Sequence, residues 1–227
     1  MEPFSRHRAP FLLDLLFPPR CPFCGQLTES SRDPVCPGCK ASLPRIPDKQ
    51  VLRQVAGFPC TVTFYYEEPV KDGIHALKFG KKAWRAGFFG QYIAQSAAEH
   101  LSGQFDAVTF VPISRRRNIR RGFDQSRLLA EAAASLWGVK VIPTLRKTRH
   151  TVPQSTLSDP KARAANVLGA YQPIRPHQIS GRGFLLIDDV LTTGSTLSAC
   201  AGTLLAAGAQ SVVCAVLAGG KKPADPA

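Results

Sequence analysis

The chain has 227 residues, enough for one full α/β domain and a small additional unit. Its formal net charge of +13 favours polyanionic partners, namely nucleic acid, phosphorylated ligands or an anionic membrane surface, without choosing among them. No stretch approaches the roughly 18–20 consecutive apolar residues of a transmembrane helix, so the sequence predicts no membrane span.

The N-terminal apolar stretch resembles the core of a secretory signal peptide, but its details differ. Asp14 interrupts the stretch, Pro18-Pro19 ends it, and no cleavage site of small residues follows. These features are more typical of a short amphipathic helix packed on the domain behind it. The sequence therefore predicts an amphipathic leading segment over residues 1–20 and a cytoplasmic protein.

Four of the seven cysteines form two knuckles, Cys21-Pro-Phe-Cys24 and Cys36-Pro-Gly-Cys39. Two tight Cys-x-x-Cys pairs supply the four thiolates of a tetrahedral structural Zn²⁺ site. A redox pair needs only one knuckle, and two disulfides fit a reducing compartment poorly. The sequence thus predicts a zinc-binding unit within residues 1–47, ended by a Pro-spaced linker at 43–47. The other cysteines, Cys60, Cys200 and Cys214, lie in apolar contexts typical of buried residues, although Cys60 is close enough in sequence to be a further candidate ligand.

From residue 55 to 220 the pattern changes to that of an α/β domain, followed by a flexible tail at 221–227. Apolar periodicity predicts strands at 61–66, 105–112, 139–145, 184–187 and 211–217, and helices over most of 70–101 and at 127–137 and 197–207. This alternation predicts a parallel sheet with helices on both faces. Residues 146–182 lack such periodicity, and an irregular segment of this length inside a domain is usually functional.

Two acids and a hydroxyl-rich loop follow the apolar run 184–187. The order Asp188-Asp189, then Thr192-Thr193-Gly194-Ser195-Thr196, then a helix points backbone N–H groups and a helix dipole at one spot that suits a phosphate. The acids at the strand end can take sugar hydroxyls or a hydrated Mg²⁺. A buried strand followed by a capped helix would explain the hydroxyl residues, but not the two adjacent acids.

Six arginines are clustered in one short segment, in which Asp124 is the only acidic residue. They are Arg115, Arg116, Arg117, Arg120, Arg121 and Arg127. Such a run is typical of a pyrophosphate-binding segment, a nucleic-acid patch or a solvated face, and the residues alone leave these alternatives open.

Residues 184–196 resemble the PRPP-binding signature of type I phosphoribosyltransferases, where PRPP is 5-phosphoribosyl-1-pyrophosphate. The whole chain resembles the ComF family, which is associated with bacterial competence and DNA use. The motifs that carry this resemblance are Pro-Pro-Arg-Cys-Pro-Phe-Cys-Gly at 18–25, Leu77-Lys78-Phe79, Val111-Pro112, Arg-Gly-Phe-Asp-Gln-Ser at 121–126, Gln154-x-x-Leu157 and Arg163-x-x-Asn166. Their order and spacing are more specific than any one of them.

The resemblance implies a role for each matching position. Asp188 and Asp189 would hold the ribose hydroxyls and act in catalysis together with Arg115. The PRPP-binding set would comprise Pro112, Ile113, Ser114 and Arg115 on the pyrophosphate side, Asp188, Asp189 and Val190 on the strand, and Thr192, Thr193, Gly194, Ser195 and Thr196 around the 5′-phosphate. A lid at 148–170 would contribute Gln154, Arg163 and Asn166, and Mg²⁺ would accompany PRPP.

Two departures from the family pattern stand out. Asp124 occupies a position where the family leads us to expect asparagine, and a carboxylate in place of an amide removes two donors. The head also carries one set of four cysteines where a longer cysteine-rich head is expected.

Two functions follow. The first is a PRPP-binding, phosphoribosyltransferase-like protein acting in competence-associated DNA uptake or processing, with an unknown acceptor and with catalysis undecided by the sequence. The second is a non-catalytic module that senses PRPP or binds single-stranded DNA through Arg116, Arg117, Arg120 and Arg121. The DNA-uptake machinery is a further expected partner, and the sequence allows a homodimer.

Overall fold

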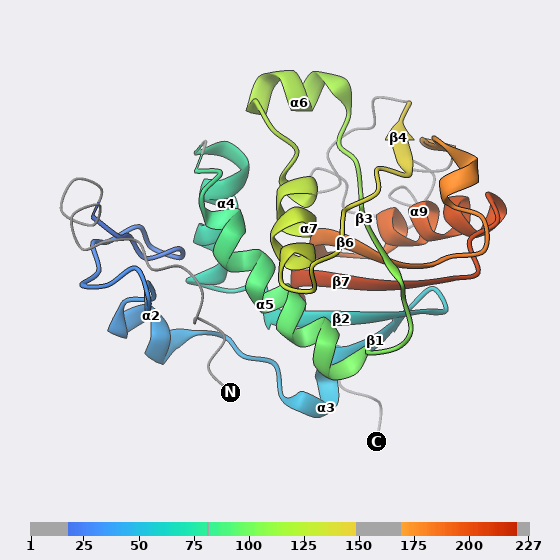
Figure 1. Ribbon diagram of the computed structural model, residues 1–227. Coiled ribbons are helices and arrows are strands. Elements are labelled where there is room, and N and C mark those ends of the chain that lie inside the picture. Colours follow the sequence, from blue (N-terminus) through green and yellow to red (C-terminus); the bar gives the residue numbers. More distant parts are fainter. Residues whose placement is uncertain (1–17, 81, 149–168, 222–227) are drawn as a thin grey trace.

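Five strands form the central sheet of the computed structural model, which describes residues 18–80, 82–148 and 169–221 (Figure 1). The strand order is β1-β2-β7-β6-β3, and only the β1–β2 pair is antiparallel. The bounds are β1 Leu52–Val55, β2 Phe58–Tyr65, β3 Ala107–Phe110, β6 Gly183–Leu191 and β7 Ser211–Gly219. The carboxyl ends of the parallel strands therefore share one edge of the sheet.

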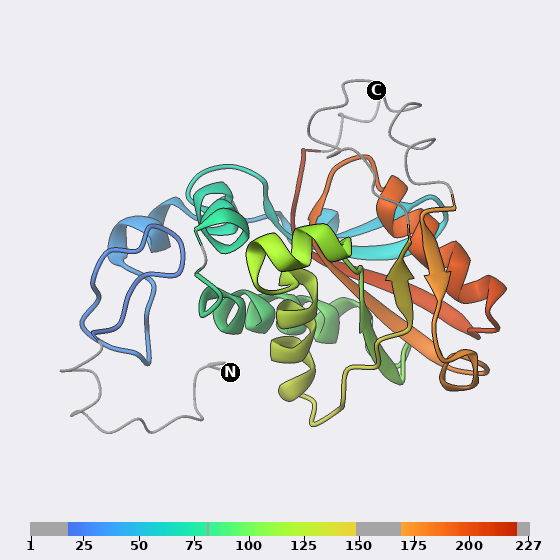
Figure 2. The same cartoon turned by 90° about the horizontal axis from the view of Figure 1, so that it is seen from above.

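Helices cover both faces of this sheet (Figures 1 and 2). Helices α4 (Val70–Phe79), α5 (Arg85–His100) and α7 (Gln125–Ser135) pack on one face, and α9 (Ser195–Ala206) packs on the other. The remaining elements are α2 (Pro37–Ser42), α3 (Asp48–Val51), α6 (Arg115–Arg121), the 3₁₀ turn η2 (Pro176–Gln178), and the antiparallel pair β4 (Leu145–Lys147) and β5 (Tyr171–Pro173). The predicted α/β fold with a mostly parallel sheet is confirmed.

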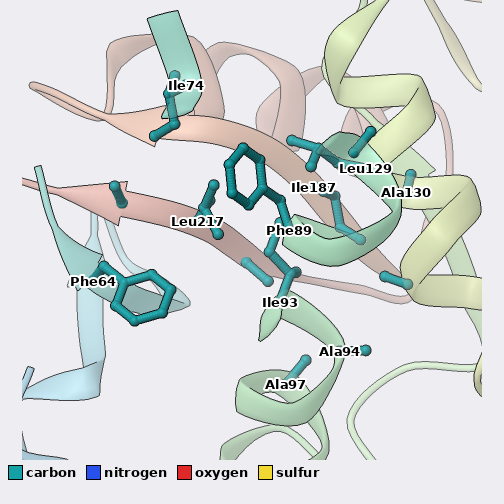
Figure 3. Close-up of a cluster of buried hydrophobic side chains, with 14 of the residues drawn as sticks. Phe64, Ile74, Phe89, Ile93, Ala94, Ala97, Leu129, Ala130, Ile187 and Leu217 are labelled. Atoms are coloured by element: carbon teal, nitrogen blue, oxygen red, sulfur yellow. The ribbon is translucent and has the colours of Figure 1, made fainter. Parts of the chain in front are cut away.

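Strand β6 is buried on both faces, and its side chains alternate between two hydrophobic cores. Leu185 and Ile187 belong to the core under α5 and α7, whereas Phe184 and Leu186 belong to the core on the α9 side. Figure 3 shows Ile187 in the first of these cores, which also holds Phe89. Burial on both sides explains why this strand has a continuous apolar sequence, and it fixes the strand end that carries the acids.

The predicted strand at 139–145 is wrong for most of its length. Within it, Val141 makes only a single parallel bridge to Val108, and a regular strand, β4, begins at Leu145 and pairs with β5 instead. Pro143 lies between these two points, and a proline has no N–H to donate to a sheet. The edge of β3 is therefore covered by an irregular segment.

Several elements form where the sequence predicts none, among them β1 and α6. The four-residue strand β1 has no apolar run, and it exists because it pairs with β2 along its whole length. The arginine-rich segment forms the short helix α6, which ends at Gly122 in the left-handed conformation typical of helix C-termini. Like charges at helical spacing disfavour a helix, and the sequence pattern predicts none there.

The cysteine unit packs on the face of the sheet that α4 and α5 cover. The ring of Phe23, between the first two cysteines, lies 6.1 Å from Phe64, 5.5 Å from Phe89 and 6.2 Å from Tyr92 between ring centroids. Ile46 is buried in the core on the α9 side, so the predicted linker 43–47 lies against the domain. The predicted leading segment covers residues 1–20, of which 1–17 lie outside the described residues, as does most of the predicted tail.

Candidate functional site

Two adjacent carboxylates at the end of β6 are held by different helices. Asp188 Oδ1 accepts a hydrogen bond from Ser126 Oγ of α7 at 2.8 Å and another from the Asp189 backbone N–H at 2.9 Å. Asp189 Oδ1 lies 2.9 Å from Lys78 Nζ of α4, and the side chain of Asp189 is 7% exposed. The pair is thus oriented by two helices that pack on the same face of the sheet.

Lys78 is a site residue to which the sequence patterns assign no role. Helix α4 buries Val70, Gly73, Ile74 and Leu77, and Lys78 follows Ile74 at a spacing of four residues. It therefore lies at the edge of the buried stripe. A cation at such a position is the local signal that points to a buried carboxylate partner. Ser126 is a second site residue that the sequence patterns do not identify. Its place at the buried start of α7 becomes clear only when the helix is known to begin at Gln125.

The segment after β3 runs beside the acids. Val111 donates its N–H to the Ile187 carbonyl at 3.0 Å, one residue before Asp188. Residues 112–115 therefore leave the same edge of the sheet as the acid pair, as the sequence predicts.

Asp124 ties this segment to the start of α7. Its Oδ1 accepts from the N–H groups of Ser126 and Arg127 at 3.1 and 3.3 Å, and its Oδ2 accepts from Ile113 N–H at 2.9 Å. An asparagine has only one oxygen and could not accept from both sides. The carboxylate at 124 therefore has a structural use that the expected amide would not provide.

The hydroxyl-rich loop 192–196 passes directly from β6 into α9. Gly194 is the N-cap of α9 with a φ of 79°, and Thr193 Oγ1 lies 2.9 Å from Ser195 Oγ. A helix of this length presents unpaired N–H groups and partial positive charge at its start. The structure thus brings together 112–114, Asp188, Asp189 and the 192–196 loop.

Glycine is required at position 194 for two reasons. A Cβ there would overlap with Val55 Cγ1, and the positive φ disfavours any L side chain. We expect Gly194→Ala to destabilise the protein by about 2–4 kcal/mol in urea unfolding. Gly202→Ala in the same helix is the matched control, because nothing lies within 4 Å of its Cβ position. Equal stability of the two variants would contradict this account.

The arginines of α6 divide into two groups. Arg115, Arg116 and Arg120 are exposed. Arg121 turns inward: its NH1 donates to Gln125 Oε1 at 2.6 Å, and its guanidinium stacks over Phe79 at 4.9 Å from the ring centroid. Burial lowers the pKa of Arg121, and the attraction of the Asp189 carboxylate is the largest opposing influence.

Arg117 also turns inward, and burial lowers its pKa. Its neighbour is Tyr171 of β5, whose hydroxyl accepts a hydrogen bond from Lys147 Nζ at 3.1 Å. Burial lowers the pKa of Lys147 to about 8, with the Arg117 charge as the next cause. Strand β4 ends just before the predicted lid at 148–170, and β5 begins just after it. The lid residues Gln154, Arg163 and Asn166 lie outside the described residues.

Three buried polar atoms at this site have no hydrogen-bond partner. They are Asp189 Oδ2, Ser114 Oγ and Arg121 Nε. Buried groups of this kind cost roughly 1–3 kcal/mol each when unsatisfied, and proteins usually pair them. A ligand that carries hydroxyl and phosphate oxygens would supply the missing partners.

Asp188 has an unusual titration. Burial raises the pKa of its carboxyl to about 7, and the neighbouring Asp189 adds to the rise against the hydrogen bond from Ser126. Since the unfolded-state pKa is about 3.9, the folded protein holds a proton here that the unfolded chain has lost over this pH range. The contribution of Asp188 to stability therefore falls as the pH rises from about 4 to 7.

We expect Asp188→Asn to be more stable than the parent at pH 8, by about 1–3 kcal/mol when partial exposure is allowed for. The difference should shrink towards pH 5, where the parent carboxyl is protonated. Urea unfolding of both proteins at pH 5 and pH 8 measures it. A stability difference that is independent of pH would contradict the assigned titration.

The four knuckle cysteines form a compact cluster. Their Sγ atoms all lie within 4.8 Å of one another, and Cys24 and Cys36 are 3.6 Å apart. Tetrahedral zinc with bonds of about 2.3 Å separates its sulfurs by about 3.8 Å. Burial and the adjacent Cys36 thiol raise the pKa of Cys39, so ionisation of this thiol near neutral pH needs a cation in this pocket. The cluster fits a structural zinc ion, whereas Cys60 lies in the sheet, where it pairs in register with Cys214.

Comparisons with known proteins agree with this geometry. A family model described as a phosphoribosyl transferase domain matches residues 124–227, and one described as a double zinc ribbon domain matches residues 12–51. The DNA utilization protein YhgH of Escherichia coli (strain K12) is 30% identical over 203 residues, which cover 85% of this chain and 86% of that protein. The Competence protein F of Haemophilus influenzae is 25% identical, over 79% of this chain and 87% of that protein. The chain belongs to the ComF family.

Another ComF relative is the Competence protein ComFC of Bacillus subtilis, which is 26% identical over 85% of this chain and 74% of that protein. Among solved structures, that of the allosteric regulatory enzyme of purine biosynthesis overlaps 58% of this chain and 25% of its own, with 20% identity and a TM-score of 0.39. A similarity this low supports no inference. Among the described residues, no helix combines the length and the apolarity that crossing a bilayer requires.

Proposed function

We propose that the chain binds PRPP with Mg²⁺ at the carboxyl ends of β3 and β6. One observation carries the proposal: the acid pair, the 112–114 segment and the start of α9 converge on a place with three unpartnered buried polar atoms. Ligands of open α/β sheets bind outside the carboxyl ends of the strands.

Each group of residues at the site is proposed to bind one part of PRPP. Asp188 and Asp189 bind the ribose hydroxyls, and the N–H groups of 192–196 bind the 5′-phosphate. The pyrophosphate lies on 112–115, and Arg121 supplies positive charge there, because Asp189 is the leading electrostatic partner of its guanidinium. Arg115 begins α6 with an exposed side chain, so it reaches the ligand only from the rim of the site.

The oxygens of Asp188 and Asp189 are the ligand type that Mg²⁺ prefers, so the donor set fits this ion. When bound with PRPP, Mg²⁺ neutralises charge on the pyrophosphate. In a transfer reaction the bond from C1′ to the pyrophosphate oxygen breaks with its electron pair on that oxygen, and an acceptor forms the new bond to C1′. The chain then orients the ribose and stabilises the departing anion.

The biological setting follows from the relatives. Proteins named for DNA utilization and competence match most of this chain, so we infer a role in the uptake or use of DNA. The free cysteines suit a reducing compartment, in line with the cytoplasmic location predicted from the sequence.

Titration calorimetry with PRPP, with and without Mg²⁺, tests the binding. We expect saturable, Mg²⁺-dependent binding at one site per chain, and its absence at millimolar PRPP would refute the proposal. A screen for pyrophosphate release with nucleobases, nucleotides and DNA ends then tests transfer. Release with one acceptor class supports an enzyme, whereas binding without release supports a PRPP sensor.

A second candidate function is the binding of single-stranded DNA by α6. This helix exposes Arg115, Arg116 and Arg120, and Ile119 between them is 74% exposed. Cations that contact phosphates release counterions, which makes the affinity depend on salt.

We expect Arg116→Gln/Arg120→Gln to lower the slope of log affinity against log salt by about 1.4 for single-stranded DNA. Fluorescence anisotropy with a labelled oligonucleotide between 50 and 200 mM salt measures this slope. Arg182→Gln is the control, because Arg182 is exposed at the opposite edge of the sheet, just before β6. A slope that the α6 variant leaves unchanged would exclude α6 as the DNA contact.

A further inference from the structure

The zinc centre described above carries a charge that the rest of the protein has to balance. Four thiolates and one Zn²⁺ have a net charge of about −2. Three of the four cysteines, Cys21, Cys36 and Cys39, are buried, so water balances only part of this charge. A buried cation close to the knuckles would complete the balance.

Arg85 is such a cation. It is 5% exposed, and its NH1 donates to the backbone carbonyl of Phe23, inside the first knuckle, at 2.9 Å. Its NH2 lies 3.1 Å from where a Cβ of Gly25 would be, directly after that knuckle. The thiols of Cys21 and Cys24 are its leading electrostatic partners, followed by the carboxylate of Asp72.

The position of Arg85 is unfavourable without such a partner. It is the first residue of α5, where the helix dipole places partial positive charge. Its Nε is buried with no hydrogen-bond partner. A buried guanidinium that is only partly satisfied is costly unless a negative charge lies close by.

Helix α4 makes a second close contact with the same knuckle. A Cβ at Gly73 of α4 would lie 3.2 Å from the Pro22 carbonyl oxygen and 3.4 Å from Phe23 Cα. The first knuckle is therefore packed against both helices that lead into the α/β core. The same helix α4 carries Lys78, which contacts Asp189.

We propose that Arg85 is the counter-charge of the zinc centre and that zinc, through Arg85, stabilises the α/β core as well as the cysteine unit. Arg85 is a positioning residue: it holds the first knuckle by its backbone and offsets the thiolate charge. Zinc occupancy and the folding of α4 and α5 are then one cooperative process. This inference does not depend on PRPP binding.

The two tryptophans of the chain allow a direct test. Trp84 lies next to Arg85, and Trp137 packs on Phe105 at a centroid distance of 5.5 Å, close to the end of α7. In a Trp84→Phe background, Trp137 alone reports the unfolding of the core. We expect removal of zinc by a chelator to lower the Trp137 unfolding temperature of the full chain.

In that background, Arg85→Gln should weaken zinc binding by about 10–100-fold, the usual loss when a partner outside the ligand shell is removed. It should also reduce the zinc-dependent shift in the Trp137 transition. Arg85→Lys keeps the positive charge but not the forked donors of the guanidinium, so its zinc affinity should lie between those of the parent and Arg85→Gln. If Arg85→Gln does not fold, Arg85→Lys provides the test in its place. Competition with a colorimetric chelator measures the affinity.

Arg53→Gln is the matched control. Arg53 is also a buried arginine, at 7% exposure, but it donates to the carbonyls of Gln50 and Gly220, and its electrostatic partners are Tyr65 and Cys60, with none of the four knuckle cysteines among them. Its loss should lower stability equally with and without zinc. An Arg85→Gln or Arg85→Lys protein that binds zinc like the parent, or a Trp137 transition that ignores zinc, would overturn the proposal.

Discussion

Replacing Asp188 and Asp189 together by asparagine is expected to weaken Mg²⁺-dependent PRPP binding at least about 100-fold. Each carboxylate is proposed to accept a hydrogen bond from a ribose hydroxyl, and hydrogen bonds to charged groups contribute roughly 1.5–3 kcal/mol each. The double variant also removes the negative charge that favours Mg²⁺. Titration calorimetry in the presence of Mg²⁺ measures the loss.

The control for this experiment carries the same change in charge. Asp72→Asn/Asp106→Asn removes two exposed carboxylates, one on α4 and one at the amino end of β3, at the far edge of the sheet from the acid pair. Its PRPP affinity should equal that of the parent. If the Asp188/Asp189 variant binds PRPP as tightly as this control does, the assignment of the acids is wrong.

The single variants separate binding from folding. Asp189→Asn leaves Lys78, which is 20% exposed, without its anionic partner, so it should reduce stability. Asp188→Asn removes a carboxyl whose ionisation burial opposes, so it should increase stability at pH 8. Adjacent residues with opposite effects on unfolding and the same effect on PRPP binding would be difficult to explain by a general loss of structure.

The sequence predicts the frame of this site because the frame is local. A continuous apolar run predicts a strand covered on both faces, and β6 is such a strand. The acids and the hydroxyl-rich loop follow it directly in the chain, so their place at the strand end needs no knowledge of the rest of the fold. The four cysteines are likewise close together in sequence, and the short spacing predicts their cluster.

The side chains that contact Asp188 and Asp189 could not be predicted from local sequence patterns. The hydrogen bond from Ser126 to Asp188 joins residues 62 positions apart, and Lys78 is further still from Asp189. These contacts depend on how α4 and α7 pack on the sheet, which no local pattern encodes. The arginine run illustrates the same limit: once α6 is helical, Arg117 and Arg121 share one face at a spacing of four residues. Six clustered arginines in the sequence do not reveal that division.

The cysteine unit is expected to bind one zinc ion per chain, although the matching family model is described as a double zinc ribbon. Residues 12–51 contain four cysteines and no histidine, and four thiolates complete a single tetrahedral site. Metal analysis of the purified chain measures the ratio. Two zinc ions per chain would require ligands from outside this unit and would contradict the site as described.

Single cysteine variants decide which thiols hold the ion. Cys36→Ser should weaken zinc binding by more than the roughly 100-fold that loss of a partner outside the ligand shell can cost, because it removes a ligand. Cys36 Sγ also accepts the Cys39 N–H at 3.5 Å, so the second knuckle loses a cap with it. Cys60→Ala should keep its zinc, since burial in the sheet raises the pKa of Cys60 to about 12 and its thiol stays protonated. Removing the Cys60 side chain should instead lower the free energy of unfolding, because it leaves a cavity between β2 and β7. Loss of zinc from Cys60→Ala would mean that the ligand set is wrong, whereas loss from Cys36→Ser alone fixes the ion on the two knuckles.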